Sequence, residues 1–159
     1  MLSRIVVGTD GSETAAEAVR HARELAKAAD AALDIVSAYE AREPHDSATA
    51  YDPTVEEGPE TEGLPADVPR AVGPRADATM ILDAAVAEAA ADGIDDITSH
   101  PREGDPAEAI LAVAEETGAD VIVVGNKGMT GTQRFLLGSV PNKITHHAPC
   151  SVYVVRTTG

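Results

Sequence analysis

Three glycines and a serine follow a short apolar run in the second half of the chain. Residues 121–124 read Val-Ile-Val-Val, and Gly125, Gly128, Gly138 and Ser139 come after them. Glycine lets the backbone approach a ligand closely, and a helix that starts after such a loop presents unpaired N–H groups and the positive end of its dipole. This spacing predicts an anion-binding loop, with phosphate as the expected anion. The alternative is a strand-to-helix connection whose glycines serve only tight turns.

Three charged side chains could add to this chemistry. Lys127 and Arg134 lie within the glycine loop. They could reach phosphate oxygens, Arg134 in a bidentate manner, or they could simply be solvated. Asp10 follows the first apolar run and could face the same ligand from another strand. It could equally be an acid at the start of a helix beside Ser12.

The rest of the chain predicts alternating strands and helices around this loop. Strands are expected at 3–8, 32–39, 94–100, 120–124 and 151–156, and helices at 13–29, 76–92, 106–117 and 139–147. Ser12, Asp105 and Ser139 are the expected helix caps, and Pro141 fits a first helical turn. Residues 40–75 are rich in proline and acids, and they are interpreted as a long loop insertion.

This order predicts an α/β fold with a five-stranded parallel sheet and helices on both faces. The uninterrupted apolar run at 121–124 is typical of a strand that is covered on both sides. The strand at 94–100 carries Asp95 and Asp96, so it is expected at an edge of the sheet. Strands one and four should flank the point where the strand order reverses, and ligands of such sheets bind there.

Length and composition limit the possible functions. The chain has 159 residues, which fits one domain spanning 1–159, and a net charge of -15 from 27 acids and 12 bases. Nucleic acid is therefore an unexpected partner, and the excess of acids indicates a protein adapted to a high-salt cytoplasm. No secretory signal or apolar run long enough for a membrane span is visible, so a cytoplasmic protein without a membrane partner is expected. Cys150 is the single cysteine, which rules out an internal disulfide.

Four sequence blocks together resemble the universal stress proteins of the UspA type, in particular their ATP-binding branch. The branch pattern is Gly, two residues, Gly, nine residues, Gly, then Ser or Thr, and Gly125, Gly128, Gly138 and Ser139 fit it. The other blocks are Ile5-Val-Val-Gly-Thr-Asp-Gly-Ser12, Gly104-Asp-Pro-Ala-Glu-Ala-Ile110 and His147-Ala-Pro-Cys-Ser-Val-Tyr-Val-Val-Arg156. The resemblance implies a Rossmann-like fold with strand order 3-2-1-4-5.

The resemblance also implies roles for the matching residues. Asp10 would contact the ribose or adenine side of ATP, Thr9 and Ala38 would border the adenine, and Val124 would lie beneath it. Backbone N–H groups of Gly125, Gly128, Gly138, Ser139 and Val140 would bind the phosphates, with Mg²⁺ or Mn²⁺ carried on the phosphates. Pro141 departs from the family, in which this position often has a residue with an N–H group.

The expected function is that of a regulatory, ATP-binding stress protein that pairs as a homodimer through the strand at 151–156. Hydrolysis is expected to be slow or absent, because no residue is an evident candidate for orienting an attacking water. Two alternatives remain open, a nucleotide-free interaction module of the same family and an ATP-hydrolysing enzyme. The P-loop and Rossmann glycine fingerprints are both absent from the sequence.

Overall fold

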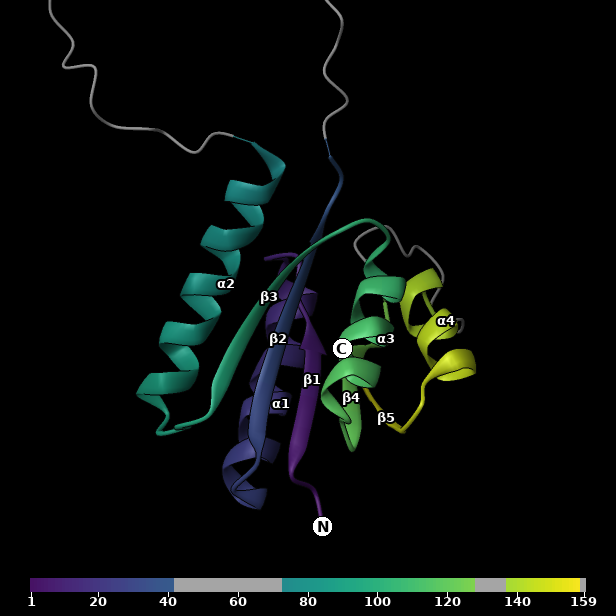
Figure 1. The fold of residues 1–159 in the computed structure, drawn as a ribbon. Helices are drawn as coiled ribbons and strands as arrows, with labels where there is room; N and C mark the ends of the chain where they lie inside the picture. The colour runs from purple at the N-terminus through teal and green to yellow at the C-terminus, as the bar shows by residue number, and fades with distance from the viewer. Residues whose placement is uncertain (42–72, 128–136, 158–159) are drawn as a thin grey trace, which may run out of the picture.

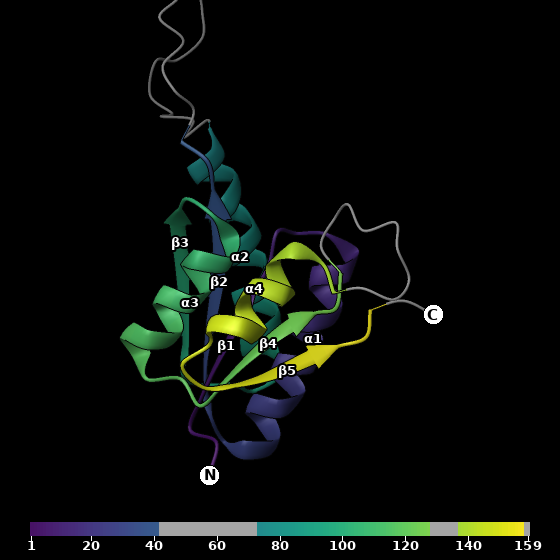
Figure 2. The same ribbon diagram turned by 90° about the vertical axis from the view of Figure 1, so that its right-hand side faces the viewer.

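The structure is a computed structural model, and it describes residues 1–41, 73–127 and 137–157. The element order is β1 (Arg4–Gly8), α1 (Glu13–Ala29), β2 (Ala32–Tyr39), α2 (Pro74–Ala91), β3 (Ile97–Glu103), α3 (Pro106–Thr117), β4 (Val121–Gly125), α4 (Ser139–His147) and β5 (Ser151–Val155). The five strands form one parallel sheet in the order β3-β2-β1-β4-β5, as Figures 1 and 2 show. The predicted fold class and strand order are confirmed. The expected insertion at 40–75 lies almost entirely outside the described residues.

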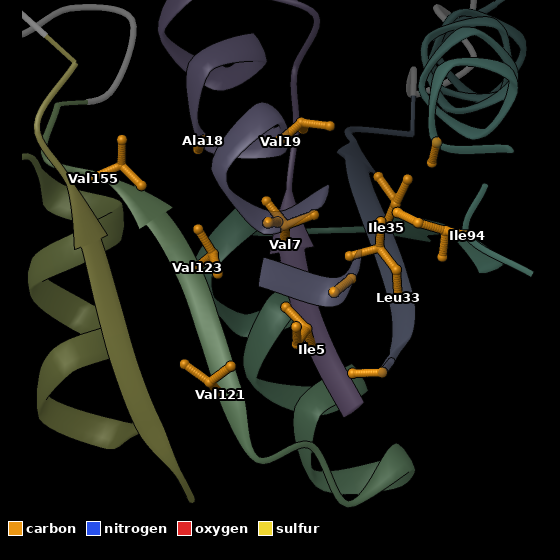
Figure 3. Packing of buried hydrophobic residues seen from close by; sticks show 14 of the residues in the cluster. Ile5, Val7, Ala18, Val19, Leu33, Ile35, Ile94, Val121, Val123 and Val155 are labelled. Atoms are coloured by element: carbon orange, nitrogen blue, oxygen red, sulfur yellow. The ribbon is translucent and has the colours of Figure 1, made fainter. Parts of the chain in front are cut away.

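Helices cover both faces of the sheet because successive strand residues point to opposite sides. On one face Ile5 and Val7 of β1 pack with buried residues of α1 and α2, and Figure 3 shows part of this cluster. On the other face Val6 packs with buried residues of α3 and α4. Alternate residues of β4 enter the two clusters in the same way, so its apolar run is explained by burial on both sides.

Side-chain caps explain where α1 and α3 begin. The Ser12 hydroxyl accepts the Ala15 N–H at 3.2 Å, and the Asp105 carboxylate accepts the Glu108 N–H at 3.0 Å, so two of the predicted caps are confirmed. The third prediction was wrong, because Gly138 occupies the cap position of α4 and Ser139 is already the first helical residue. The Asn142 N–H donates to the Gly138 carbonyl at 3.0 Å, which draws Ser139 into the first turn.

Two elements differ from their predicted bounds by more than one residue. Helix α2 begins at Pro74 rather than 76, and β3 spans Ile97–Glu103 rather than 94–100. Ile94 is buried beneath the α2 face instead of joining the strand, and its N–H donates to the Ala89 carbonyl. The edge position of β3 is confirmed. An edge strand tolerates Pro101, which cannot donate to a neighbour.

No helix in the described ranges combines the length and the apolar character that a membrane crossing requires.

Candidate functional site

A cavity lies where the strand order of the sheet reverses. From β1 the chain crosses through α1 to β2 on one side, and from β4 it crosses through α4 to β5 on the other. The adjacent strands β1 and β4 end at Gly8 and Gly125. Such a switch point is where parallel α/β sheets bind ligands. The cavity here has a volume of about 590 Å³.

Its lining comes from four parts of the chain. The end of β1, the following turn and the start of α1 contribute six residues, β2 and its end contribute three, α3 two, and the β4 end with the α4 start six. They are Gly8, Thr9, Asp10, Ser12, Thr14 and Ala15; Val36, Ala38 and Glu40; Pro106 and Ile110; and Val124, Gly125, Lys127, Ser139, Val140 and Pro141.

Most residues singled out in the sequence come together around this cavity. They are Thr9, Asp10, Ala38, Val124, Gly125, Lys127, Ser139 and Val140. Gly138 is not among the lining residues, and its N–H donates to the Asn126 carbonyl at 3.0 Å. Gly128 and Arg134 lie outside the described residues.

The turn after β1 is fixed by its own hydrogen bonds. The Thr9 N–H donates to the Val36 carbonyl at 2.8 Å, which ties the turn to β2. The Gly11 N–H donates to the Thr9 hydroxyl at 3.2 Å, and the Ser12 N–H donates to the Asp10 carboxylate at 2.9 Å. Asp10 therefore bonds to the residue that caps α1 and also lines the cavity.

Two features of the turn explain why residue 11 is glycine. Its φ of 80° lies in the left-handed region, where other residues are strained. A Cβ at this position would also stand 3.2 Å from Ile81 of α2. The turn that carries Asp10 is therefore packed against α2.

One end of the cavity is apolar. Val36 and Ala38 of β2 line it together with Pro106 and Ile110 of α3, and Val36, Ala38 and Ile110 pack in one hydrophobic cluster. Ile110 reaches this place because residue 8 is glycine, since a Cβ there would stand 2.3 Å from the Ile110 Cδ1 atom. Glu40, directly after β2, also belongs to the lining.

The other end offers groups that suit an anion. Lys127 is the cation among the described lining residues, and Ser139 at the N-terminus of α4 lines the same cavity. The two segments are joined by the hydrogen bond from the Gly138 N–H to the Asn126 carbonyl. Ser139 and Val140 bring backbone N–H groups to this first turn, whereas Pro141 has none and the Asn142 N–H is bonded to Gly138. The dipole of α4 adds to the attraction for negative charge.

The starts of α3 and α4 are held together next to the cavity. The Lys143 ammonium donates to the Glu108 carboxylate at 3.0 Å and to Asp105 at 3.4 Å. The Glu108 N–H, followed by Lys143, lowers the pKa of the Asp105 carboxyl below its usual value, and the Glu108 carboxylate raises the pKa of Lys143. These contacts fix the spacing between Pro106 and the first turn of α4.

Sequence reasoning missed a large part of the lining. Pro106 and Ile110 were expected only as parts of a helix, and Glu40 only as part of a loop. Their place in the cavity depends on how α3 packs across β1 and β2, which no local pattern reveals. Ser12 and Thr14 carried a usable signal, because their hydroxyls directly follow the β1 turn.

In the described ranges, no group of three or more His, Cys, Asp or Glu side chains is arranged to hold a metal ion.

Comparisons with known proteins agree with the geometry. The family model described as "Universal stress protein family" matches residues 1–156. Universal stress protein Rv1636 of Mycobacterium tuberculosis (strain ATCC 25618 / H37Rv) is 36% identical over 154 residues, which cover 97% of this chain and 96% of the relative. The crystal structure of Rv1636 has a TM-score of 0.56 at 31% identity and covers 99% of this chain and 97% of its own.

Two further solved structures are similar to this one. A universal stress protein crystallised in complex with cAMP has a TM-score of 0.68 at 32% identity, covering 99% of this chain and 98% of its own. UspA from Lactobacillus plantarum has a TM-score of 0.65 at 21% identity, covers 98% of both chains and shows the same fold. This chain belongs to the universal stress protein family.

Proposed function

We propose that this protein binds ATP in the cavity at the switch point and acts as a nucleotide-dependent regulator in a stress response. The observation that carries the proposal is the polarity of the cavity. Apart from Glu40, its lining from β2 and α3 is apolar, and its lining at the α4 end includes Lys127, Ser139 and a helix N-terminus. A volume of about 590 Å³ falls in the range of small-molecule sites.

This polarity sets the direction of the ligand. The adenine would lie against Ala38 and Val36, with Thr9 and Asp10 beside the nucleoside and Val124 beneath it. The phosphates would extend past Gly125 to Lys127, Ser139 and the Val140 N–H. Gly128 and Arg134, which lie outside the described residues, would contribute to the same end. Mg²⁺ or Mn²⁺ would be carried by the phosphate oxygens, as hard cations are in other nucleotide sites.

Binding without rapid turnover is the form of activity that we propose. Lys127 could neutralise charge on the phosphates, but hydrolysis also requires a group that orients an attacking water. The Asp10 carboxylate already accepts the Ser12 N–H, and in the proposed orientation of ATP it would lie beside the nucleoside rather than the phosphates. We therefore propose slow hydrolysis or none.

A titration with matched lysine variants tests the proposal. Purified protein is stripped of ligand by denaturation, the released nucleotide is identified by mass, and the refolded protein is titrated with ATP. Lys127→Met should weaken ATP binding at least about tenfold, because a hydrogen bond to a charged group contributes roughly 1.5–3 kcal/mol. Lys27→Met, an exposed lysine on α1, is the control and should bind as the wild type does.

Two outcomes of this titration contradict the proposal. If the Lys127 and Lys27 variants bound ATP with equal affinity, Lys127 would not bind the phosphates and the proposed phosphate end would be wrong. Absence of both retained and added nucleotide in the wild type would favour the interaction module without nucleotide.

A nucleotide with one phosphate is the second candidate. Pro141 and the engaged Gly138 N–H leave two backbone N–H groups, Ser139 and Val140, in the first turn of α4. The relative that is 32% identical was crystallised with cAMP. Competition of cAMP against ATP in the same titration separates the two, since tighter binding of cAMP would favour this second ligand.

We further propose that the protein works as a homodimer that pairs through β5. This strand is at the edge of the sheet, and Tyr153 and Val154 are exposed on it. An uncovered edge strand is a template for pairing with another chain.

A further inference from the structure

Asn126 joins three elements at the phosphate end of the proposed site. Its N–H donates to the Val155 carbonyl at the end of β5, at 2.8 Å. Its own carbonyl accepts the Gly138 N–H at the start of α4, at 3.0 Å. Its side-chain oxygen accepts both the N–H and the hydroxyl of Thr157, each at 2.9 Å. Asn126, directly after β4, thus forms hydrogen bonds to the end of β5, to Thr157 after β5 and to the N-cap residue of α4.

The two sequence neighbours of Asn126 line the cavity, whereas Asn126 itself does not. Gly125 and Lys127 are both lining residues, and Ser139 follows the glycine that Asn126 holds. The position of the Lys127 backbone and of the first turn of α4 therefore depends on where Asn126 is fixed.

Thr157 can serve as the anchor because residue 125 has no side chain. A Cβ on Gly125 would stand 3.1 Å from the Thr157 methyl group. Glycine at this position lets the residue behind β5 lie close against the end of β4. Thr157 is partly buried there, so its two donors meet the Asn126 oxygen in a sheltered place.

We propose that the hydrogen-bonded pair of Asn126 and Thr157, called here the 126–157 latch, is a positioning device for the phosphate end. The inference rests on the proposed nucleotide function. The latch does not contact the ligand. It holds Lys127 and the Ser139 and Val140 N–H groups at a fixed spacing, so that the phosphates find the donors already in place. The apolar end, built by β2 and α3, has no bond to the latch and should be independent of it.

This independence separates positioning from a simple structural role. A residue that only stabilises the fold would, on removal, weaken the binding of every ligand together. A positioning residue at one end should affect ligands that carry phosphate and spare the free nucleoside. Adenosine is therefore the comparison ligand for ATP.

The experiment measures ATP and adenosine affinities of the full chain and of four variants. Asn126→Ala removes both side-chain bonds, and Thr157→Val removes the hydroxyl bond at nearly constant shape. Thr157→Ser retains both donors and should restore wild-type binding. Asn142→Ala changes an exposed residue of α4 outside the cavity lining and is the control. Thermal unfolding of each unliganded variant checks that it folds.

Asn126→Ala should weaken ATP binding about tenfold and adenosine binding less than about twofold, because two lost bonds at about 0.7 kcal/mol each together correspond to a factor of about ten. Thr157→Val should lose about threefold for ATP by the same reasoning. Parallel losses for ATP and adenosine, or unchanged ATP binding in both variants, would overturn the inference while leaving ATP binding by the wild type established. If the wild type bound no nucleotide, the proposed function would fail and the inference with it. If Asn126→Ala does not fold, the ATP and adenosine affinities of Thr157→Val are compared with those of Thr157→Ser, and this comparison tests the inference.

Discussion

Asp34 is a buried carboxylate in the middle of β2. It is only 1% exposed, and its two oxygens meet the Arg4 guanidinium at 2.9 Å and the His100 ring at 2.7 Å. Arg4 comes from β1 and His100 from β3, so the contacts join three neighbouring strands. An isolated charge in this place would be costly, and the two partners compensate for its loss of water.

Replacing Asp34 should therefore lower stability clearly. Asp34→Ala leaves Arg4 and His100 without their shared partner, and breaking a buried ion pair from one side costs roughly 3–5 kcal/mol. Because the Arg4 side chain is 31% exposed, we expect the lower end, about 3 kcal/mol. Urea denaturation measures the loss. Asp83→Ala, an exposed acid on α2, is the control and should stay within about 0.5 kcal/mol of wild type. Equal midpoints for the two variants would show that the buried contacts add no net stability.

The starts of α3 and α4 are the elements on which the site depends most. Pro106 and Pro141 stand in their first turns and both line the cavity. The Asp105 carboxylate caps α3, and Lys143 of α4 reaches back to it and to Glu108. The carboxylates at the start of α3 thus hold α4 in position through Lys143.

This capping makes a prediction about acid. The Glu108 N–H and Lys143 lower the pKa of Asp105 below its ordinary value of 3.8, so its contribution to stability is complete above that value and is lost as the pH falls through the lower, folded-state pKa. Asp105→Ala should cost about 1 kcal/mol at pH 7, the usual value for a lost cap. The difference from wild type should shrink below the ordinary pKa. Urea midpoints at neutral and acid pH measure it, and a constant difference would contradict the assigned role.

Asp105→Asn is the matched variant, because asparagine caps a helix without a charge. It should retain most of the stability that alanine loses at neutral pH, and its remaining deficit reports the contact with Lys143. A deficit as large as that of alanine would mean that the charge, and not the cap, holds the helix start.

Elements that carry their own start and stop signals could be predicted from the sequence. The bounds of α1 and α3 agree with the structure, because Ser12, Asp105 and Gly118 act on their immediate neighbours. The bounds of β2 and α4 also agree with the structure. The bounds of β3 could not be predicted, since its seven-residue ladder is fixed by pairing with β2, over residues whose own sequence is polar. The same limit applies to Asp34, whose partners lie 30 and 66 positions away.

At the scale of the molecule, the glycine pattern predicted the lining from β4 and α4. The lining from β2 and α3 depends on the order of the strands in the sheet. Gly125 ends β4, Lys127 follows it, and Ser139 begins α4, and all three line the cavity. Ile110 faces them only because the sheet order brings α3 over β1 and β2. No local sequence pattern predicts how α3 packs over β1 and β2, so the apolar lining could be identified only from the three-dimensional structure.

The proposed dimer can be tested through the direction of the hydrogen bonds in β5. Since the Val155 carbonyl accepts from Asn126 and points toward β4, the backbone groups of Val154 point to the free edge, because neighbours in a strand alternate. Val154→Pro should therefore block pairing through this edge while keeping the bonds to β4, and Val154→Ala, which retains its N–H, should still pair. Sedimentation at micromolar concentration should give twice 16.4 kDa for wild type and Val154→Ala, and 16.4 kDa for Val154→Pro.

Two copies that each carry a charge of -15 repel one another, so the dimer fraction should rise with KCl as the repulsion is screened. This salt dependence distinguishes association limited by charge from a fold that the proline has damaged, because only the former is changed by salt at constant helix content. A wild type that stays monomeric at high KCl would contradict the proposed dimer. A dimeric Val154→Pro variant would place the contact between subunits elsewhere than β5.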